Sequence, residues 1–424
     1  MKKLYTVLAA AVAFAGASAA TTLVADNAVA QQLRENLILE AADASIQKAP
    51  AKVVAAPVDG EWNVVGKGTY TEDLMCEVSP ELGLEPGAQW EVTFEQSASE
   101  PAWYRTIIYN ENSPLIDIME AADESYFYFN VANPDKVFAT PYTAYEAFDF
   151  YNANEDCADW TKILQNPSVV LDNQKYGKLQ DGVVSFPAKS FMYHDKEEGY
   201  LLWVNTYAFM SFTLPGATAP ESWRTLGSGH FSDGIFGTLF GGTEEQSEPF
   251  EYDVTVCQST TNANVYSVPS MFGQLELSGW NYAPARFIFD TTDPEDVDIN
   301  EQSSGWSSTD NGLISIICRR YFQGFDKTKD ACKFADNKLQ IPATGILYHM
   351  VLPYNGVPTE GYWTLQGAVP STLDIPAGAV DNVVIADEAA PVKFYNLAGV
   401  EVSKPAAGIY IMRQGNKASK VFIR

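Results

Sequence analysis

The stretch best equipped for binding chemistry runs CRRYFQGFDKTKDAC, from Cys318 to Cys332. It gathers positive charge and an aromatic ring on a chain whose formal net charge is −27. Guanidinium groups grip anions or sugar hydroxyls through forked hydrogen bonds, and rings stack on sugars. The candidate ligand-binding residues are Arg319, Arg320, Tyr321, Lys327 and Lys329. The alternative interpretation is a solvated hairpin whose cations pair weakly with nearby acids.

The cysteine pattern predicts one disulfide at most. Five cysteines are an odd number, and the expected domains are large enough to fold without bridges. Cys318 and Cys332 are the disulfide candidate, because they stand close together at the two ends of the basic stretch. On the loop-entropy model this bridge would contribute about 3 kcal/mol.

The chain has only three histidines, which are few for a metal site or a catalytic triad. His194 and His349 hold equivalent places, each directly after a tyrosine, whereas His230 stands alone. Because zinc needs three or four converging ligands, we expect histidines that are hydrogen-bonded locally within strands. The sequence contains no G-x-S-x-G, HExxH or P-loop motif, so no catalytic residue and no metal ligand are assigned.

Carboxylates are abundant, and one acidic stretch suggests calcium. DTTDPEDVDINE, from Asp290 to Glu301, lacks the glycine and glutamate spacing of an EF-hand. We therefore expect a solvated acidic turn and no cofactor, with calcium as the weaker interpretation. A glycosidase would need two acids held about 5 Å or about 6.5–9.5 Å apart, which sequence does not define. Five tryptophans could offer planes to a sugar, although we expect most to be core: Trp103, Trp160, Trp203, Trp280 and Trp306.

The elements that position these residues form a repeat. WNVVGKGTYTED starts at Trp62, and WRTLGSGHFSDG starts at Trp223. Three further blocks match in the same order and at nearly the same spacing: WEVTFEQ with YDVTVCQ, FYFNVANPDKV with FIFDTTDPEDV, and FPAKSFMYH with IPATGILYH. Trp363 and Gly367 resemble a truncated third start. The paired glycines of the first block indicate a bulge or close packing under a ring.

The repeated blocks alternate apolar and polar residues with period two, as in a strand that is solvated on one face. The triplets Asn133–Asp135 and Asp293–Glu295 are turn signals. We predict an all-β protein with two tandem homologous antiparallel domains, sandwich-like or barrel-like, and a small C-terminal β-module. The expected boundaries are 58–218, 219–359 and 360–424.

The N-terminus has the features of an export signal. Lys2 and Lys3 precede an apolar run, and Ala17-Ser18-Ala19 is a small-x-small cleavage pattern, so residues 1–20 are the predicted signal peptide. Residues 21–57 read as an N-terminal segment with an Ala/Pro linker. No stretch reaches the roughly 20 apolar residues of a membrane helix. The negative charge makes nucleic acid an unlikely partner on electrostatic grounds.

The closing stretch from Val392 to Arg424 predicts four short strands, with turns at Asn396–Gly399, Pro405–Gly408 and Gln414–Asn416. This stretch resembles the C-terminal sorting tail of the type IX secretion system, with its YNLxG turn, GxY strand and basic-apolar close. The residues that carry the resemblance are Tyr395, Asn396, Gly399, Gly408, Tyr410, Lys420 and Arg424. It implies periplasmic passage, outer-membrane secretion machinery as a partner, and a secreted or cell-surface destination.

The tandem body also resembles repeats in uncharacterised exported proteins of gut-type gram-negative bacteria, and no activity comes with that resemblance. We expect a secreted or surface-exposed, non-enzymatic binding protein for a glycan or a host protein. A secreted glycan-degrading enzyme and a structural surface component without a specific ligand are the alternatives.

Overall fold

The computed structural model describes residues 55–78, 84–114, 125–145, 148–157, 174–196, 201–236, 249–275, 279–354, 357–363, 369–376, 392–395, 408–414 and 417–423. The predicted signal peptide and nearly all of the predicted N-terminal segment lie outside these residues. The chain divides into two compact units, Met1–Pro376 and Ala377–Arg424.

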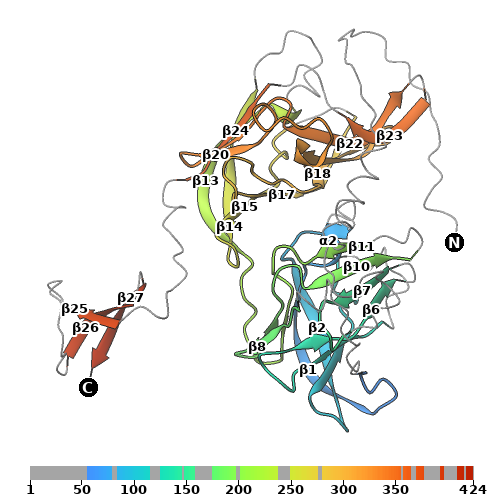
Figure 1. The fold of residues 1–424 in the computed structure, drawn as a ribbon, viewed down its shortest axis with the longest axis vertical. Coiled ribbons are helices and arrows are strands. Elements are labelled where there is room, and N and C mark those ends of the chain that lie inside the picture. The colour runs from blue at the N-terminus through green and yellow to red at the C-terminus, as the bar shows by residue number, and fades with distance from the viewer. Residues whose placement is uncertain are drawn as a thin grey trace, which may run out of the picture. The chain divides into compact units, whose positions relative to one another are not determined.

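Strands dominate the described secondary structure, as Figure 1 shows, and every strand pair between them is antiparallel. Helical elements are short, such as α2 (Met75–Val78) and the 3-10 helix η4 (Arg319–Tyr321). The predicted all-β class is confirmed. None of the helices in the described part of the chain has the length and hydropathy needed to cross a membrane.

The first copy of the repeat forms two sheets. Its strands are β1 (Trp62–Thr71), β2 (Gln89–Ser97), β3 (Trp103–Thr106), β4 (Phe127–Asn130), β5 (Phe138–Ala139), β6 (Tyr142–Tyr145), β7 (Phe148–Asn152), β8 (Lys178–Gln180), β9 (Val183–Ser185), β10 (Phe191–Asp195), β11 (Leu201–Val204) and β12 (Ser211–Thr213). The larger sheet has the order β5-β4-β3-β2-β1-β12-β9-β8, and the smaller β11-β10-β7-β6.

The second copy repeats this plan. Its strands are β13 (Trp223–Asp233), β14 (Phe250–Ser259), β15 (Val265–Pro269), β16 (Asn281–Tyr282), β17 (Arg286–Asp290), β18 (Gln302–Ser308), β19 (Gly312–Cys318), β20 (Lys333–Ala335), β21 (Lys338–Ile341), β22 (Ile346–Tyr354), β23 (Val357–Trp363) and β24 (Ser371–Asp374). The sheet orders are β17-β15-β14-β13-β24-β21-β20 and β16-β18-β19-β22-β23. The two homologous domains predicted from the repeat are therefore present.

Aromatic side chains fill the core between the two sheets of the first copy. Phe127 of the larger sheet lies 5.3 Å from Tyr142 and 6.1 Å from Phe191, both of the smaller sheet, between ring centroids. These contacts join the sheets because alternate residues of each strand face inward. Of the five tryptophans considered as sugar planes, Trp103 and Trp306 are buried, Trp203 and Trp280 are partly exposed, and Trp160 lies outside the described residues.

The paired glycines of each copy have distinct structural reasons. Gly66 and Gly227 lie at register shifts and have φ of 137° and 144°, a region that side chains disfavour. Gly68 and Gly229 lie under the neighbouring strand, where a Cβ would fall 2.1 Å and 2.2 Å from a backbone carbonyl oxygen. In each pair the first glycine therefore lies at a bulge, and the second lies in close contact with the neighbouring strand.

The Asx-Pro turns also match between copies. The Asn133 side chain accepts a hydrogen bond from the Asp135 amide (3.1 Å), as Asp293 does from the Glu295 amide (3.0 Å). The proline between them fixes φ, and the Asx side chain closes the turn. The local prediction for both triplets agrees with the structure.

The second copy extends beyond the predicted boundary at residue 359. That boundary falls within β23, which pairs with β22 along its length, and β24 pairs with β13 and β21. Trp363, expected to begin a truncated third copy, is fully buried opposite Tyr348. It belongs to the last strand of the smaller sheet because the pairing register of β22 continues through it. The second unit starts after Pro376.

The second unit contains a three-stranded antiparallel sheet of order β25-β26-β27, made of β25 (Val392–Tyr395), β26 (Gly408–Gln414) and β27 (Lys417–Ile423). Four tail residues that carry the sorting-tail resemblance have defined backbone partners, and three of them are Tyr395 with Ile411, Gly408 with Ile423, and Tyr410 with Val421. Lys420 pairs with Ile411. Asn396, Gly399, Arg424 and the strand expected near Val400 lie outside the described residues.

Candidate functional site

The basic loop predicted to bind a ligand lies against acids of its own copy. Its ion pairs are Arg319 with Asp330 (3.5 Å), Arg320 with Asp296 (3.7 Å), Lys327 with Asp293 (3.1 Å) and Lys329 with Asp326 (3.4 Å). The Tyr321 hydroxyl donates to the Asp298 carboxylate at 2.6 Å. This arrangement corresponds to the alternative interpretation of paired cations, and an anionic ligand would have to displace these carboxylates.

The acids come largely from the stretch that suggested calcium. The backbone amide of Val297 in that stretch donates to Cys332 O at 2.8 Å, which fixes the acidic turn against the basic loop. No group of three or more His, Cys, Asp or Glu side chains able to hold a metal occurs among the residues that the structure describes. The turn therefore has a structural partner for its charge.

The two candidate cysteines are buried thiols in the structure, with no bond between them. Burial raises the pKa of the Cys332 thiol to about 12 and that of Cys318 well above its ordinary value. A protonated, buried thiol is a poor nucleophile and metal ligand. Their pairing as a disulfide stays a prediction.

The histidines do not converge on one place. The His349 ring stacks on Tyr362 with centroids 4.4 Å apart, and its Nδ1 lies 2.7 Å from Glu301 Oε1. Exposed His230 contacts Glu251 and Asp253, and hydrogen bonds to these carboxylates raise the pKa of His230. His230 and His349 therefore have local partners, as the sequence suggested, whereas the buried Nδ1 of His194 has no hydrogen-bond partner among the described residues.

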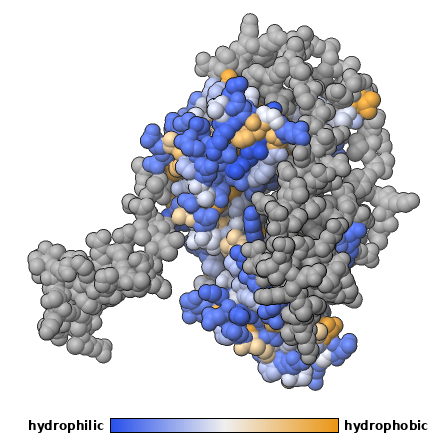
Figure 2. All heavy atoms as spheres, viewed as in Figure 1, coloured by the Kyte–Doolittle hydropathy of each residue, from blue (hydrophilic) through white to orange (hydrophobic). Residues whose placement is uncertain are grey.

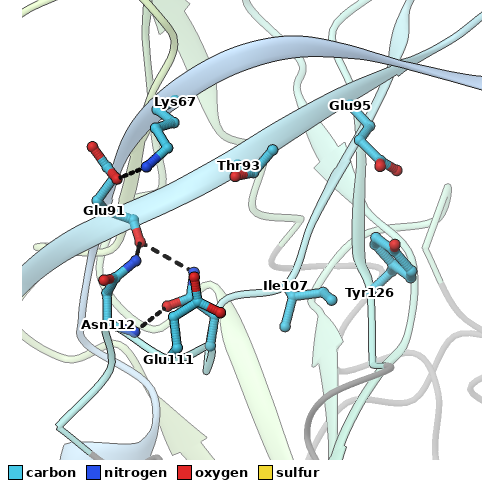
Figure 3. A pocket seen from close by; sticks show the side chains of 9 residues that line it. Lys67, Glu91, Thr93, Glu95, Ile107, Glu111, Asn112 and Tyr126 are labelled. Carbon is cyan, nitrogen blue, oxygen red and sulfur yellow. Dashed lines mark hydrogen bonds and ion pairs between the residues drawn. The ribbon is translucent and has the colours of Figure 1, made fainter.

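A hollow of about 180 Å³ lies on the solvent side of the first-copy sheet. Its lining residues are Lys67, Glu91, Thr93, Glu95, Ile107, Asn110, Glu111, Asn112 and Tyr126. Figure 3 shows Glu91, Thr93 and Glu95 along β2, with Lys67 beside Glu91 and Tyr126 near Glu95. These β2 residues face solvent because Trp90, Val92 and Phe94 between them are buried. We call this hollow and the rings beside it the outer face.

The outer face contains two ion pairs. Lys67 Nζ lies 2.5 Å from Glu91 Oε1, and the hydrogen bond to Glu91 raises the pKa of Lys67. Arg105 Nε lies 2.5 Å from Glu95 Oε2. The Arg105 and Glu95 side chains are only 16% and 18% exposed, so this pair is sheltered from solvent, unlike the Lys67–Glu91 pair.

Aromatic rings flank the sheltered pair. The Arg105 guanidinium lies 3.9 Å from the Tyr126 ring centroid and 4.6 Å from that of Trp62. Trp62 also contacts Tyr128 edge to face, at 5.6 Å. Cation–π contacts of this kind hold the guanidinium and both rings in place. The result is a group of packed rings beside a polar hollow.

Two amide side chains form the remaining wall of the hollow. Asn110 Nδ2 and Asn112 Nδ2 both donate to the Glu91 carbonyl oxygen, at 3.1 Å and 3.2 Å. The Asn112 amide donates in turn to Asn110 Oδ1 at 2.9 Å. The loop after β3 is thereby tied to β2, and the hollow has a defined shape without any ligand.

The corresponding face of the second copy is covered by polypeptide. Trp223, the counterpart of Trp62, donates from Nε1 to the Pro86 carbonyl of the first copy at 2.9 Å. Arg286 occupies the place of Tyr126, stacks over Trp223 at 5.1 Å and pairs with Glu85 at 3.2 Å. In contrast, the indole N–H of Trp62 has no acceptor among the described residues.

The sequence contained only part of the signal for the outer face. The alternation of Glu91, Thr93 and Glu95 predicts a solvated strand face, and the repeat aligns Trp62 with Trp223. Arg105 and Tyr126 carry no local pattern of their own. Their contact depends on the pairing of β2 with β3 and of β3 with β4, which sequence reasoning did not resolve.

Figure 2 shows that the described surface visible in that view is mostly hydrophilic, with separate hydrophobic spots. The exposed large hydrophobic residues among those described include Val64 and Val65, at 66% and 39% exposure, on the strand that carries Trp62. Apolar surface is thus available next to the outer face.

Comparisons with protein-family models, with curated proteins and with solved structures find no match to this chain.

Proposed function

We propose that the protein is an exported, non-enzymatic binding protein and that its ligand is a glycan held at the outer face of the first copy. The observation that carries this proposal is the hollow of about 180 Å³ lined by carboxylates, amides and a hydroxyl beside fixed aromatic rings. Binding sites combine apolar and aromatic surface with a few oriented polar groups in this way, and a sugar has both an apolar C–H face and hydroxyl edges.

Export and surface location rest on the sequence. The predicted signal peptide and the sorting-tail resemblance both favour passage through the periplasm to the cell surface or the medium. The backbone pairing of the β25–β27 sheet is compatible with the strand-rich tail that the resemblance implies. The mass of the protein recovered from culture medium tests this, because it reports whether residues 1–20 and the tail are removed.

Binding is tested by titrating the mature protein with a panel of oligosaccharides in isothermal calorimetry. We expect Tyr126→Ala to weaken binding at least about tenfold, which corresponds to about 1.4 kcal/mol. Tyr176→Ala is the matched control, since Tyr176 is a partly exposed tyrosine of the same copy outside the hollow lining. Equal losses in both variants, or in neither, would remove the outer face as the site.

The glycan-degrading alternative predicts released sugar in the same incubations. Glu91 is 51% exposed and paired with Lys67, an environment unlike the desolvated pocket that a glycosidase acid requires. Binding without product supports the proposal. Product whose formation depends on Glu91 or Glu95 would establish the enzyme instead.

A protein ligand is the second candidate, and one observation favours it. The second copy uses the equivalent tryptophan to hold a Glu-Pro-Gly turn of the first copy. The first-copy face has an acid of its own at Glu95, where the second copy has Cys257, so it does not need one from a partner. Binding of a protein, with no glycan bound at millimolar concentration, would select this candidate.

A further inference from the structure

The hollow of the outer face is small for a binding site. Its volume is about 180 Å³. A protein cavity of about 150 Å³ admits one benzene ring, whereas pockets for drug-sized ligands measure about 300–1,000 Å³. A hollow of this size therefore has room for one six-membered ring with its substituents and not for two linked rings.

One aromatic plane serves the hollow. Tyr126 is the single aromatic residue among the described residues that line it. The Arg105 guanidinium, which is not part of the lining, lies 3.9 Å from the Tyr126 ring centroid, so one face of this ring is left for a ligand. Trp62 lies outside the lining and is packed against Arg105 at 4.6 Å and Tyr128 at 5.6 Å. The lining therefore supports one stacked sugar unit.

The polar groups of the lining match the hydroxyls of one such ring. Glu91 and Glu95 each hold a cation through one carboxylate oxygen, and the second oxygen of each can accept a hydrogen bond. The Lys67 ammonium and the Thr93 hydroxyl carry donor hydrogens. Figure 3 shows Thr93 between the two glutamates on β2. Because hydroxyl groups both donate and accept, a sugar ring uses both kinds of group.

The second copy does not repeat this site. Arg286 aligns with Tyr126, which removes the stacking ring, and Cys257 aligns with Glu95, which removes a carboxylate. The arginine is itself engaged, because it pairs with Glu85 of the first copy at 3.2 Å. The duplication therefore gives the chain one sugar site of this kind, not two.

We propose that each chain binds a glycan through one sugar unit at one site, with the remaining units of the glycan in solvent. The C–H face of that ring packs on Tyr126, and its hydroxyls exchange hydrogen bonds with Glu91, Thr93 and Glu95. This inference rests on the proposed glycan-binding function and narrows it to recognition of a single unit. A monosaccharide is therefore a complete ligand, and lengthening the glycan adds no contact.

The test titrates the full mature chain by isothermal calorimetry with glucose, galactose, N-acetylglucosamine, glucosamine and galacturonic acid, each as the monosaccharide and as a tetrasaccharide. For the sugars that bind, we expect one ligand per chain. The dissociation constants of the two lengths should agree within about fivefold, which covers the statistical advantage of a ligand with several equivalent units. A second subsite would instead tighten tetrasaccharide binding by at least about tenfold.

Two variants connect the result to the hollow. Tyr126→Ala should weaken binding at least about tenfold and Glu91→Gln about fivefold, in each case equally for both lengths. Glu91 is 51% exposed, so its substitution leaves the core intact. Asp253→Asn is the matched control, because Asp253 is the exposed counterpart of Glu91 in the second copy, and it should change neither affinity nor stoichiometry.

The outcomes separate the two proposals. If no sugar of either length binds, or if Tyr126→Ala leaves binding unchanged, the glycan site at the outer face fails. If tetrasaccharides bind at least about tenfold more tightly than monosaccharides, or two ligands bind per chain, and Tyr126→Ala abolishes that binding, the glycan site stands and the single-unit inference is wrong. Length-independent binding of one ligand per chain that depends on Tyr126 and Glu91 but not on Asp253 supports both.

Discussion

The buried carboxylate of Asp233 allows a quantitative prediction of how the stability of the second copy depends on pH. Asp233 ends β13 and is fully buried. Its Oδ1 accepts hydrogen bonds from the amides of Ile235 (2.9 Å) and Phe236 (3.0 Å), and its Oδ2 accepts one from the Tyr252 hydroxyl (2.9 Å). These bonds favour the ionised form, yet burial outweighs them and raises the pKa of Asp233 from 3.8 to about 6.

The raised pKa fixes the sign of the pH dependence. The folded protein binds the Asp233 proton more tightly than the unfolded chain, so this group's contribution to the free energy of unfolding is complete below pH 3.8. It is lost as the pH rises toward about 6. A pKa difference of about two corresponds to about 3 kcal/mol. The second copy should therefore lose about that much stability from Asp233 alone between these pH values.

Asp233→Asn removes the titration while retaining an oxygen acceptor for the two amides. Urea denaturation from pH 4 to pH 7, followed by hydrogen-exchange pulse labelling of β13 and β14 peptides, reports the unfolding of the second copy. The difference in unfolding free energy, wild type minus Asp233→Asn, should fall by about 2 kcal/mol between pH 4 and pH 7, because part of the total of about 3 kcal/mol is already lost at pH 4. Taking the difference cancels the titration of the other acids.

Asp310→Asn serves as the control, because Asp310 is an exposed acid in the turn between β18 and β19 of the same copy. Its difference from wild type should stay nearly constant over the same pH range. A constant difference for Asp233→Asn, or one that rises with pH, would show that hydrogen bonding and not burial controls the ionisation of Asp233.

Substitutions also test the contact between the two copies and the state of the basic loop. Trp223→Ala should lower the unfolding temperature, because it removes the hydrogen bond to the first copy and the stacking contact with Arg286. Trp62→Ala should weaken sugar binding with a smaller loss of stability. Thermal melts measure the stability of both variants, and calorimetry measures their sugar binding. Gly87→Ala should loosen the contact between copies, measured as faster proteolysis there, because a Cβ would lie 2.5 Å from a side-chain carbon of the second copy. If Cys318 and Cys332 pair in the exported protein, denaturing thiol titration will find two thiols fewer, and Cys318→Ser will cost about 3 kcal/mol.

The fold was predictable because its signals are local and occur twice. Alternation along WEVTFEQ identifies a strand with one buried face, and the same alternation along YDVTVCQ in the second copy shows that it is not accidental. The Asx-Pro triplets likewise close their turns through side chains that bond to the backbone of the same triplet. The end of the second copy was misplaced because β24 joins β13 across the copy, a pairing that no local pattern encodes.

The site was less predictable because its contacts join distant strands. The sequence drew attention to both the basic loop at Arg319 and the acidic turn at Asp293, but treated them as separate features. The structure brings them together through the Val297–Cys332 backbone hydrogen bond, so that each neutralises the other. The basic loop therefore stands out in the sequence as a run of positive charge, although its charges are paired with acids in the structure.

The two copies place an arginine at different positions of this face and pair it with a carboxylate from a different source: Arg105 aligns with Ser267, whereas Arg286 aligns with Tyr126. In the second copy Arg286 takes its carboxylate from Glu85 of the preceding copy, and the face is thereby used for packing. In the first copy Arg105 pairs with Glu95 on the adjacent strand, so its charge is matched without a carboxylate from another part of the chain. A pair completed within the sheet keeps its geometry when a ligand arrives and leaves, whereas a pair that needs an incoming carboxylate would select acidic partners. Glu95 and Arg105 of the first copy align with Cys257 and Ser267 of the second, so the second copy lacks both members of the ion pair that the first copy forms within its sheet.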